Sequence, residues 1–418
     1  MGSNSTTVWT SWSNVFLGLL LVATPITFGI ERAVLFWNDC ICGILLIFFG
    51  LAARRAAHPL IPWLGALVGV WLQAAPLIFW AKQPICYLSD TLVGMLAMIF
   101  FIVVPPLRGG AADTGSAQPP GWSYNPSSWS QRLPIIICAV ICWSISRYLA
   151  TYQLGYIDHV WEPFFDPGTE AVLTSKISKL FPVSDAGLGA MAYSLEFLLA
   201  CQGGERRWRT SPWMCVLSGI FIVPVSLVSV ILIISQPIGV GAWCTLCLCT
   251  ALFALITVPL GADELILTLQ YLRRSKEKPL WRLFFEGGGC SHGKEDQRSP
   301  SGSASLGEIF RASLWGITMP ITLLASVLIG VMLMFMPWIF GITDPLMRDS
   351  DYILGPLSIV ISITALSELL RFVRWGNLLI AAILVMTHGM NLIHLSLAVI
   401  LALLSIPRGK ICEYTQFE

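Results

Sequence analysis

Long apolar segments alternate with shorter polar ones along almost the whole chain. A helix needs about 20 mainly apolar residues to cross the hydrocarbon core of a bilayer. Twelve segments are candidates for such spans, the last two being short: residues 13–30, 34–53, 62–80, 88–106, 133–152, 186–202, 212–234, 242–262, 313–340, 351–370, 375–389 and 391–406. The pattern predicts an all-α, polytopic membrane protein with about 12 transmembrane helices.

Three longer polar segments divide the chain. Residues 108–131 are rich in Gly, Pro and Ser, a composition that predicts a linker. Residues 153–185 carry five acids against two lysines, Lys176 and Lys179. Residues 271–311 are basic and then rich in Gly and Ser, which is typical of a partly disordered loop.

Composition supports the membrane interpretation. Charged residues make up 12% of the chain and hydrophobic residues 56%, whereas about 25% of a soluble domain is charged. The net charge of +1 offers no basic surface for nucleic acid. With a cytoplasmic N-terminus, 19 Lys and Arg fall in inner segments and 6 in outer ones, in line with the positive-inside rule. Residues 153–185 are then extracytoplasmic, and residues 271–311 form a cytosolic loop.

An internal repeat relates several pairs of spans. A shift of 51 residues aligns Trp12 with Trp63, Gly18 with Gly69, Pro25 with Pro76, Phe28 with Phe79, Asp39 with Asp90 and Gly43 with Gly94. A third copy keeps the internal spacing with Gly330, Pro337, Gly341, Asp351 and Gly355, and a fourth that begins at Trp375 soon degenerates. Each copy predicts one helical hairpin, whose Asp opens the second helix and caps its N-terminus. The hairpin, with Met336-Pro337-Trp338, resembles the bacterial SPW repeat.

The twelve cysteines include one spacing with clear chemical meaning. Cys244 and Cys247 form a C-x-x-C motif at the outer end of the eighth predicted span. This spacing places both sulfurs on one helix face, and a helix N-terminus favours the thiolate that disulfide exchange needs. Zinc would need further Cys or His ligands, and none is near in the sequence. Simple packing of two small residues stays an alternative.

The surroundings of this motif resemble the vitamin K epoxide reductase family. The block 133–262 has four spans, a long outer loop between the first two, and the C-x-x-C at the start of the fourth. The segments 170–175 and 184–196 are similar to the loop end and second helix of that family. The resemblance implies that the dithiol reduces a quinone of the ubiquinone or menaquinone type, with Cys247 facing the quinone. Cys244 would exchange with an extracytoplasmic, thioredoxin-like protein.

Three further residues are candidates for binding the quinone. By the resemblance, Asp185 stands where family members place an Asn that hydrogen-bonds a quinone oxygen, although helix capping explains an Asp there equally well. Tyr193 and Thr250 are possible polar groups of the same pocket, but ordinary interfacial or backbone-bonded roles are more common for such residues.

One feature departs from the family. Many members carry a cysteine pair in the outer loop that relays electrons, whereas residues 153–185 contain no Cys, and Thr169 stands where a relay Cys is often found. Cys40, Cys42 and Cys86 lie at the predicted outer surface, and we hypothesise that they replace the relay or form a disulfide that braces the hairpins. Unpaired, packed cysteines are an equally good alternative.

Other polar residues in the spans are weaker candidates. Cys138 and Cys142 are expected to pack, and Arg147 to reach the membrane surface or meet an acid of the outer loop. His388 and His394 are expected to be satisfied polar residues rather than ligands, so that no metal site is predicted.

The sequence thus predicts two hairpins in residues 1–107, a four-helix redox bundle in residues 132–270 and further hairpins in residues 312–418. We expect an integral membrane thiol–disulfide oxidoreductase, in a bacterial inner membrane, that interacts with lipid, quinone and an extracytoplasmic thiol protein. Two other functions stay open, a transporter and a non-catalytic scaffold. A transporter would work without Cys244 and Cys247, and a scaffold would tolerate their replacement by Ser.

Overall fold

The computed structural model describes residues 2–55, 60–103, 117–275, 278–288, 296, 298–300, 304–389 and 391–413. This part of the chain is helical, and its only β-structure is an isolated bridge between Ile317 and Ser367. Among the described residues, eight helices are long and apolar enough to cross a membrane. The predicted all-α, polytopic membrane fold is confirmed.

The helices follow the twelve predicted spans, with short helices between them. The first bundle contains α1 (Gly2–Thr27), α2 (Ala33–Arg55), α3 (Leu60–Ile78) and α4 (Pro84–Val103). The central region contains α5 (Trp129–Gln153), α6 (Gly168–Thr174), α7 (Asp185–Cys201), α8 (Arg207–Thr210), α9 (Pro212–Ser235), the π-helix η1 (Gln236–Val240), α10 (Thr245–Arg274) and α11 (Leu280–Glu286). The last region contains α12 (Leu306–Ser313), α13 (Ile321–Phe340), α14 (Pro345–Thr364), the 3₁₀-helix η2 (Arg371–Trp375), α15 (Gly376–His388) and α16 (Leu392–Ser405).

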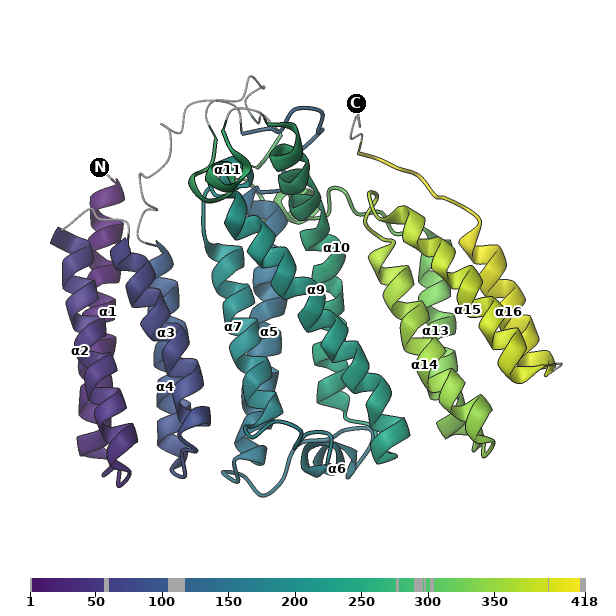
Figure 1. The fold of residues 1–418 in the computed structure, drawn as a ribbon, viewed down its shortest axis with the longest axis horizontal. Helices are drawn as coiled ribbons and strands as arrows, with labels where there is room; N and C mark the ends of the chain where they lie inside the picture. The colour runs from purple at the N-terminus through teal and green to yellow at the C-terminus, as the bar shows by residue number, and fades with distance from the viewer. Residues whose placement is uncertain are drawn as a thin grey trace.

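The long helices form three bundles side by side (Figure 1). In the first bundle α1 packs on α2 and α4, and α3 packs on α2 and α4. The third bundle repeats this arrangement, because α13 packs on α14 and α16, and α15 packs on α14 and α16. The central bundle pairs α5 with α7 and α9 with α10, and α10 also packs on α5.

The repeated glycines explain why three hairpins share one sequence signature. A Cβ atom at Gly18 would lie 2.5 Å from the carbonyl oxygen of Gly43, and one at Gly69 would lie 2.6 Å from that of Gly94. The third hairpin has the same contact, with 2.8 Å between a Cβ at Gly330 and the Gly355 oxygen. The backbones therefore cross too closely for any side chain, as at other small-residue crossings between membrane helices.

The repeated aspartates do not cap their helices, so that prediction is wrong. Asp39, Asp90 and Asp351 are each the seventh residue of their helix, and their side chains are fully buried. Helices α4 and α14 begin earlier than predicted because Pro84 and Pro345 occupy the first helical turn, where proline needs no hydrogen-bond donor. The repeat thus places an acid inside each hairpin, two turns below its outer end.

Two predicted boundaries also differ from the structure. Part of the predicted linker 108–131 is packed, because Trp122, Tyr124 and Asn125 are buried. The span predicted at 313–340 begins only at residue 321, after the short amphipathic helix α12.

Polar contacts attach the first bundle to the central one. Arg147 on α5 donates to the hydroxyl oxygen of Thr91 and to the carbonyl of Leu88, both at 2.7 Å. It therefore reaches α4, and not the membrane surface or the outer loop as predicted. The indole of Trp143, also on α5, donates to Gln73 over 3.2 Å.

Candidate active site

The centre of the site is a disulfide between Cys244 and Cys247 at the start of α10. Cys244 is the N-cap residue, and its sulfur accepts a hydrogen bond of 3.1 Å from the backbone N–H of Cys247. The Cα atoms lie 5.3 Å apart, within the usual range for bridged cysteines. Cys244 is completely buried, whereas Cys247 is half-buried. The spacing therefore places the two sulfurs together, as predicted.

The segment before the motif holds Cys244 in position. The π-helix η1 is followed by Gly241, whose left-handed backbone (φ of 74°) turns the chain toward α10. The side-chain oxygen of Gln236 then accepts a hydrogen bond of 3.0 Å from the backbone N–H of Cys244. This bond occupies a donor at the helix start that α10 itself cannot satisfy.

The outer loop covers the motif through one carboxylate. Glu162 accepts hydrogen bonds from the backbone N–H and the hydroxyl group of Thr245, the residue after Cys244, and from the hydroxyl group of Thr169. Partial burial opposes ionisation of Glu162, but these hydrogen bonds outweigh it and lower the pKa of the carboxyl group. The bonds join the loop, α6 and α10 around the disulfide.

Backbone packing strengthens this cover. A Cβ atom at Gly168, the first residue of α6, would lie 2.1 Å from the carbonyl oxygen of Trp243. Thr169, the position where the family resemblance places a relay cysteine, is fully buried at this contact. The loop therefore packs over Cys244. Thr169, which stands where a relay cysteine is missing, lies against the segment that leads into the motif.

An apolar cavity of about 420 Å³ lies beneath the cover. Four of the five predicted site residues line it, namely Cys247, Thr250, Asp185 and Tyr193. The remaining wall is mainly apolar and comes from α5, α6 and the loop after it, α7, α9, η1 and α10. Cys244 is not part of the wall, so that the two cysteines face different surroundings.

The structure distinguishes the roles of the three predicted polar residues. Ser184, not Asp185, caps α7, because its hydroxyl accepts a hydrogen bond of 3.0 Å from Gly187. One carboxylate oxygen of Asp185 instead accepts hydrogen bonds from Gln153 and from the backbone of Ala186. Tyr193 is buried, with its hydroxyl oxygen 3.3 Å from that of Ser229. The hydroxyl of Thr250 donates to the backbone of its own helix over 2.8 Å.

Among the described residues, the other cysteines form no disulfide with the motif. Cys40, Cys42 and Cys86 are free thiols, and the hypothesised bracing disulfide between the hairpins is not formed. Cys42 and Cys86 are buried within the first bundle. This is the arrangement expected if they are unpaired, packed cysteines. Cys138 and Cys142 are buried in the central bundle, as expected.

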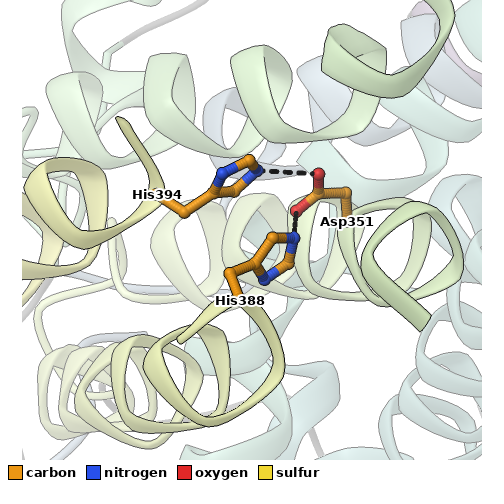
Figure 2. A group of neighbouring side chains, drawn as sticks. All are labelled: Asp351, His388 and His394. Carbon is orange, nitrogen blue, oxygen red and sulfur yellow. Dashed lines mark hydrogen bonds and ion pairs between the residues drawn. The ribbon is translucent and has the colours of Figure 1, made fainter. Parts of the chain in front are cut away.

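Sequence reasoning missed one cluster. Asp351, His388 and His394 come together in the third bundle with their side chains buried, and Figure 2 shows both imidazole rings directed at the carboxylate. The signal in the sequence was weak, because the two histidines lie six residues apart on different helices and Asp351 was interpreted as a helix cap.

Comparison with known families confirms both resemblances. Residues 133–261 match the vitamin K epoxide reductase family, and residues 8–104 match the SPW repeat domain. No curated protein and no solved structure matches the chain. The third hairpin lies outside the SPW match, although it has the same glycine crossing. The protein is thus an integral membrane protein whose central region matches the vitamin K epoxide reductase family of oxidoreductases, preceded by a region that matches the SPW repeat domain.

Proposed function

We propose that the protein is a membrane thiol–disulfide oxidoreductase that couples the Cys244–Cys247 pair to reduction of a quinone. The observation that carries the proposal is the apolar cavity with Cys247 in its wall. Its volume of about 420 Å³ is within the range of pockets that hold small apolar ligands. An electron acceptor bound there would meet Cys247 before Cys244.

The polar groups of the cavity fit a quinone. A quinone ring is apolar and carries two carbonyl oxygens, which accept hydrogen bonds. Tyr193 offers a hydroxyl donor, and Asp185 offers a donor when its carboxyl group is protonated. When bound, the quinone accepts two electrons and two protons. The two thiols supply these electrons as the disulfide bond between Cys244 and Cys247 forms.

Turnover then requires a second dithiol from outside the cytoplasm. A thiolate of a thioredoxin-like partner attacks the sulfur of Cys244, the disulfide bond breaks, and Cys247 leaves as a thiolate. The second thiol of the partner attacks the mixed disulfide and releases Cys244 as a thiolate. The partner is thereby oxidised to a disulfide, and its two electrons pass through the cysteine pair to the quinone.

The buried position of Cys244 sets a condition for this exchange. Cys244 packs with Val160 of the outer loop and Leu173 of α6, and Glu162 ties that loop to Thr245, so that an incoming thiolate reaches the sulfur only when the loop moves aside. The closed loop instead shields Cys244 from outside thiols while Cys247 faces the cavity. Loop opening therefore belongs to the proposed cycle.

The proposed setting follows from charge and from the arrangement of the ends. Both termini and α11 lie at one end of the molecule, opposite α6 and the disulfide (Figure 1). The excess of Lys and Arg in the segments at the end with the termini supports a cytoplasmic N-terminus, in a bacterial inner membrane. We assign residues 132–270 to the redox bundle and residues 1–107 and 312–418 to hairpins that flank it.

Trapping the redox state of Cys244 and Cys247 in the membrane tests the proposal. Cells with and without quinone synthesis are quenched with acid, and free thiols are alkylated and counted by mass spectrometry. We expect a disulfide in normal cells and free thiols in quinone-depleted cells. The variant Cys249→Ser, which removes a free cysteine two residues away, serves as a control and keeps this response.

Two results would contradict the proposal. A pair that stays in one redox state under both conditions is not coupled to quinone. Substrate flux that persists in a Cys244→Ser/Cys247→Ser variant would indicate a transporter instead.

A further inference from the structure

The cluster of Asp351, His388 and His394 lies apart from the cavity and joins three helices. Asp351 comes from α14, His388 is the last residue of α15, and His394 stands in the first turn of α16. Nε2 of His388 lies 3.2 Å from Oδ1 of Asp351, and Nε2 of His394 lies 3.1 Å from Oδ2 (Figure 2). The side chains of Asp351 and His388 are completely buried, and that of His394 is 4% exposed.

The hydrogen bonds of His388 determine which of its nitrogens carries the proton. Nδ1 lies 3.2 Å from the carbonyl oxygen of Leu384, which can only accept, and 2.9 Å from the hydroxyl oxygen of Thr387. The Thr387 hydroxyl donates to the carbonyl of Ile383, so it too acts as an acceptor toward the ring. Nδ1 therefore bears the hydrogen, and Nε2 of the neutral ring has a lone pair.

That lone pair faces a carboxylate oxygen, which also carries lone pairs. Neither Nε2 of His388 nor Oδ1 of Asp351 has a hydrogen-bond partner among the described residues. Two acceptors at 3.2 Å repel each other unless a proton or a metal ion lies between them, and burial strengthens the repulsion. The arrangement thus requires a positive charge at this point.

The spacing of the three side chains suits a metal ion. Their ligand atoms all lie within 4.8 Å of one another. Zinc binds His nitrogen and Asp oxygen at about 2.0–2.2 Å in tetrahedral sites, which places neighbouring ligand atoms about 3.3–3.6 Å apart. The separations of 3.2 and 3.1 Å from the two Nε2 atoms to Oδ1 and Oδ2 of Asp351 are close to this. The two imidazole rings are stacked, with centroids 3.8 Å apart and planes 18° apart, so the rings turn toward the ion when both nitrogens bind it. The backbone bond from Nδ1 of His388 is also the usual outer contact of a metal-binding histidine.

The first bundle provides an internal comparison. Asp39 on α2 and Asp90 on α4 occupy the position equivalent to Asp351 on α14, and both are fully buried. In the third bundle α16 takes the place of α4, and there Asp351 has His394 of α16 as its partner. His388 adds a second imidazole from α15. The repeat position thus holds two buried acids in the first bundle, whereas in the third bundle its one acid is joined by two imidazoles.

We propose that Asp351, His388 and His394 bind one divalent transition-metal ion, of which zinc fits the ligands and distances best. Two imidazole nitrogens and one carboxylate oxygen are a ligand set that suits zinc, and they leave a fourth position for water. The ion ties α14 to α15 and α16. These last two helices are short, with 13 and 14 residues, and the metal fastens their ends to the third hairpin.

Metal analysis of the full-length protein tests this site. Oxidised protein in lipid nanodiscs is stripped with a chelator, equilibrated with zinc sulfate, freed of excess ion and analysed by inductively coupled plasma mass spectrometry. We expect about one equivalent of zinc, and at least a tenfold loss of affinity in His394→Gln and in His388→Ala. The control His159→Gln changes a histidine of the exposed outer loop and keeps the zinc.

A second readout separates lost ligands from a lost fold. Cobalt(II) in place of zinc gives visible absorption bands typical of tetrahedral coordination, and zinc raises the thermal midpoint of the wild type but not of His394→Gln. Each variant must keep the Cys244–Cys247 disulfide, which shows that the central bundle is intact. A wild type that binds no zinc, or a His388→Ala/His394→Gln variant that binds as much, would overturn the proposal. Neither result depends on quinone reduction.

Discussion

Glu162 is the side chain that ties the outer loop to the start of α10, beside the Cys244–Cys247 pair. It bonds to the backbone and the side chain of Thr245, and it reaches Thr169 in α6. Bonds to a charged group contribute about 1.5–3 kcal/mol each, and more than one is lost when the carboxylate is removed. The closed loop therefore depends strongly on this one residue.

We predict that Glu162→Gln exposes the disulfide. The amide cannot replace a carboxylate acceptor at all of these donors, so the open loop becomes at least tenfold more populated. Reduction of Cys244–Cys247 by a water-soluble phosphine, followed by thiol labelling, should accelerate by the same factor. The control Asp158→Asn removes an exposed carboxylate of the same loop and should leave the rate unchanged. Equal rates in wild type and Glu162→Gln would show that the loop does not guard the motif.

The same measurement has an expected pH dependence. The pKa of Glu162 is lowered in the folded loop, so its contribution is complete above the ordinary carboxyl value of 4.5 and is lost as the pH falls through the lowered value. The difference between wild type and Glu162→Gln should be complete at pH 6 and should shrink progressively as the pH falls below 4.5. The phosphine reduces disulfides at acidic pH, which makes the comparison possible. A difference that does not shrink as the pH falls would assign the effect to the shape of the side chain.

At the scale of single residues, the sequence predicted those contacts that depend only on local spacing along the chain. The C-x-x-C motif is local, because four residues at a helix start bring two sulfurs together wherever the helix lies. The placement of Asp185 and Tyr193 in one cavity with Cys247 followed from the family resemblance. The ligand cluster depends on how α14, α15 and α16 pack, and no spacing along the chain encodes that contact.

At the scale of the helices, the sequence repeat corresponds to the glycine pairs at which the two helices of each hairpin cross. Gly69 and Gly94 hold α3 and α4 at backbone contact, and the same pair recurs in the other two hairpins. The sequence repeat predicted the hairpins correctly, because a crossing of this kind needs glycine at both positions. It misplaced the starts of α4 and α14, because each of these helices opens with a proline, Pro84 or Pro345, a residue that is also typical of loops.

We predict that Gly69→Ala destabilises the first bundle. The added methyl group would lie 2.6 Å from the carbonyl oxygen of Gly94, and two helix backbones cannot separate without losing contacts along their length. We expect a loss of about 1–3 kcal/mol, measured by thermal unfolding in nanodiscs. Gly307→Ala is the matched control, because nothing lies within 4 Å of a Cβ atom there. A midpoint unchanged by Gly69→Ala would mean that the crossing is not tight.

At the scale of the whole molecule, the three bundles place the disulfide at one end and both termini at the other (Figure 1). The central bundle is held between the hairpin bundles, through Arg147 on one side and through contacts of Trp243 with Phe335 and Tyr352 on the other. Trp243, the residue before Cys244, thus packs against the third bundle. One of its partners there is Tyr352, the residue after Asp351.

This arrangement predicts the labelling of two introduced cysteines in intact bacterial cells, each compared with the same background without it. Phe164→Cys lies in the outer loop, where the side chain is 75% exposed, and Leu306→Cys lies at the opposite end, where it is 86% exposed. In a background with Cys412→Ser, a membrane-impermeant maleimide should label position 164 directly and position 306 only after permeabilisation. The reverse pattern would place the N-terminus outside the cytoplasm.

The wall of the cavity has a consequence for how the enzyme would be saturated. Leu180, Phe181, Val228 and Leu232 line the cavity and are also exposed on the molecular surface. On the proposed function, a quinone dissolved in the bilayer would enter sideways, between helix α9 and the loop that follows α6, without passing through water. Its occupancy then depends on its mole fraction in the lipid. At a constant amount of quinone per volume of sample, adding empty lipid should slow turnover, although the concentration in the tube has not changed.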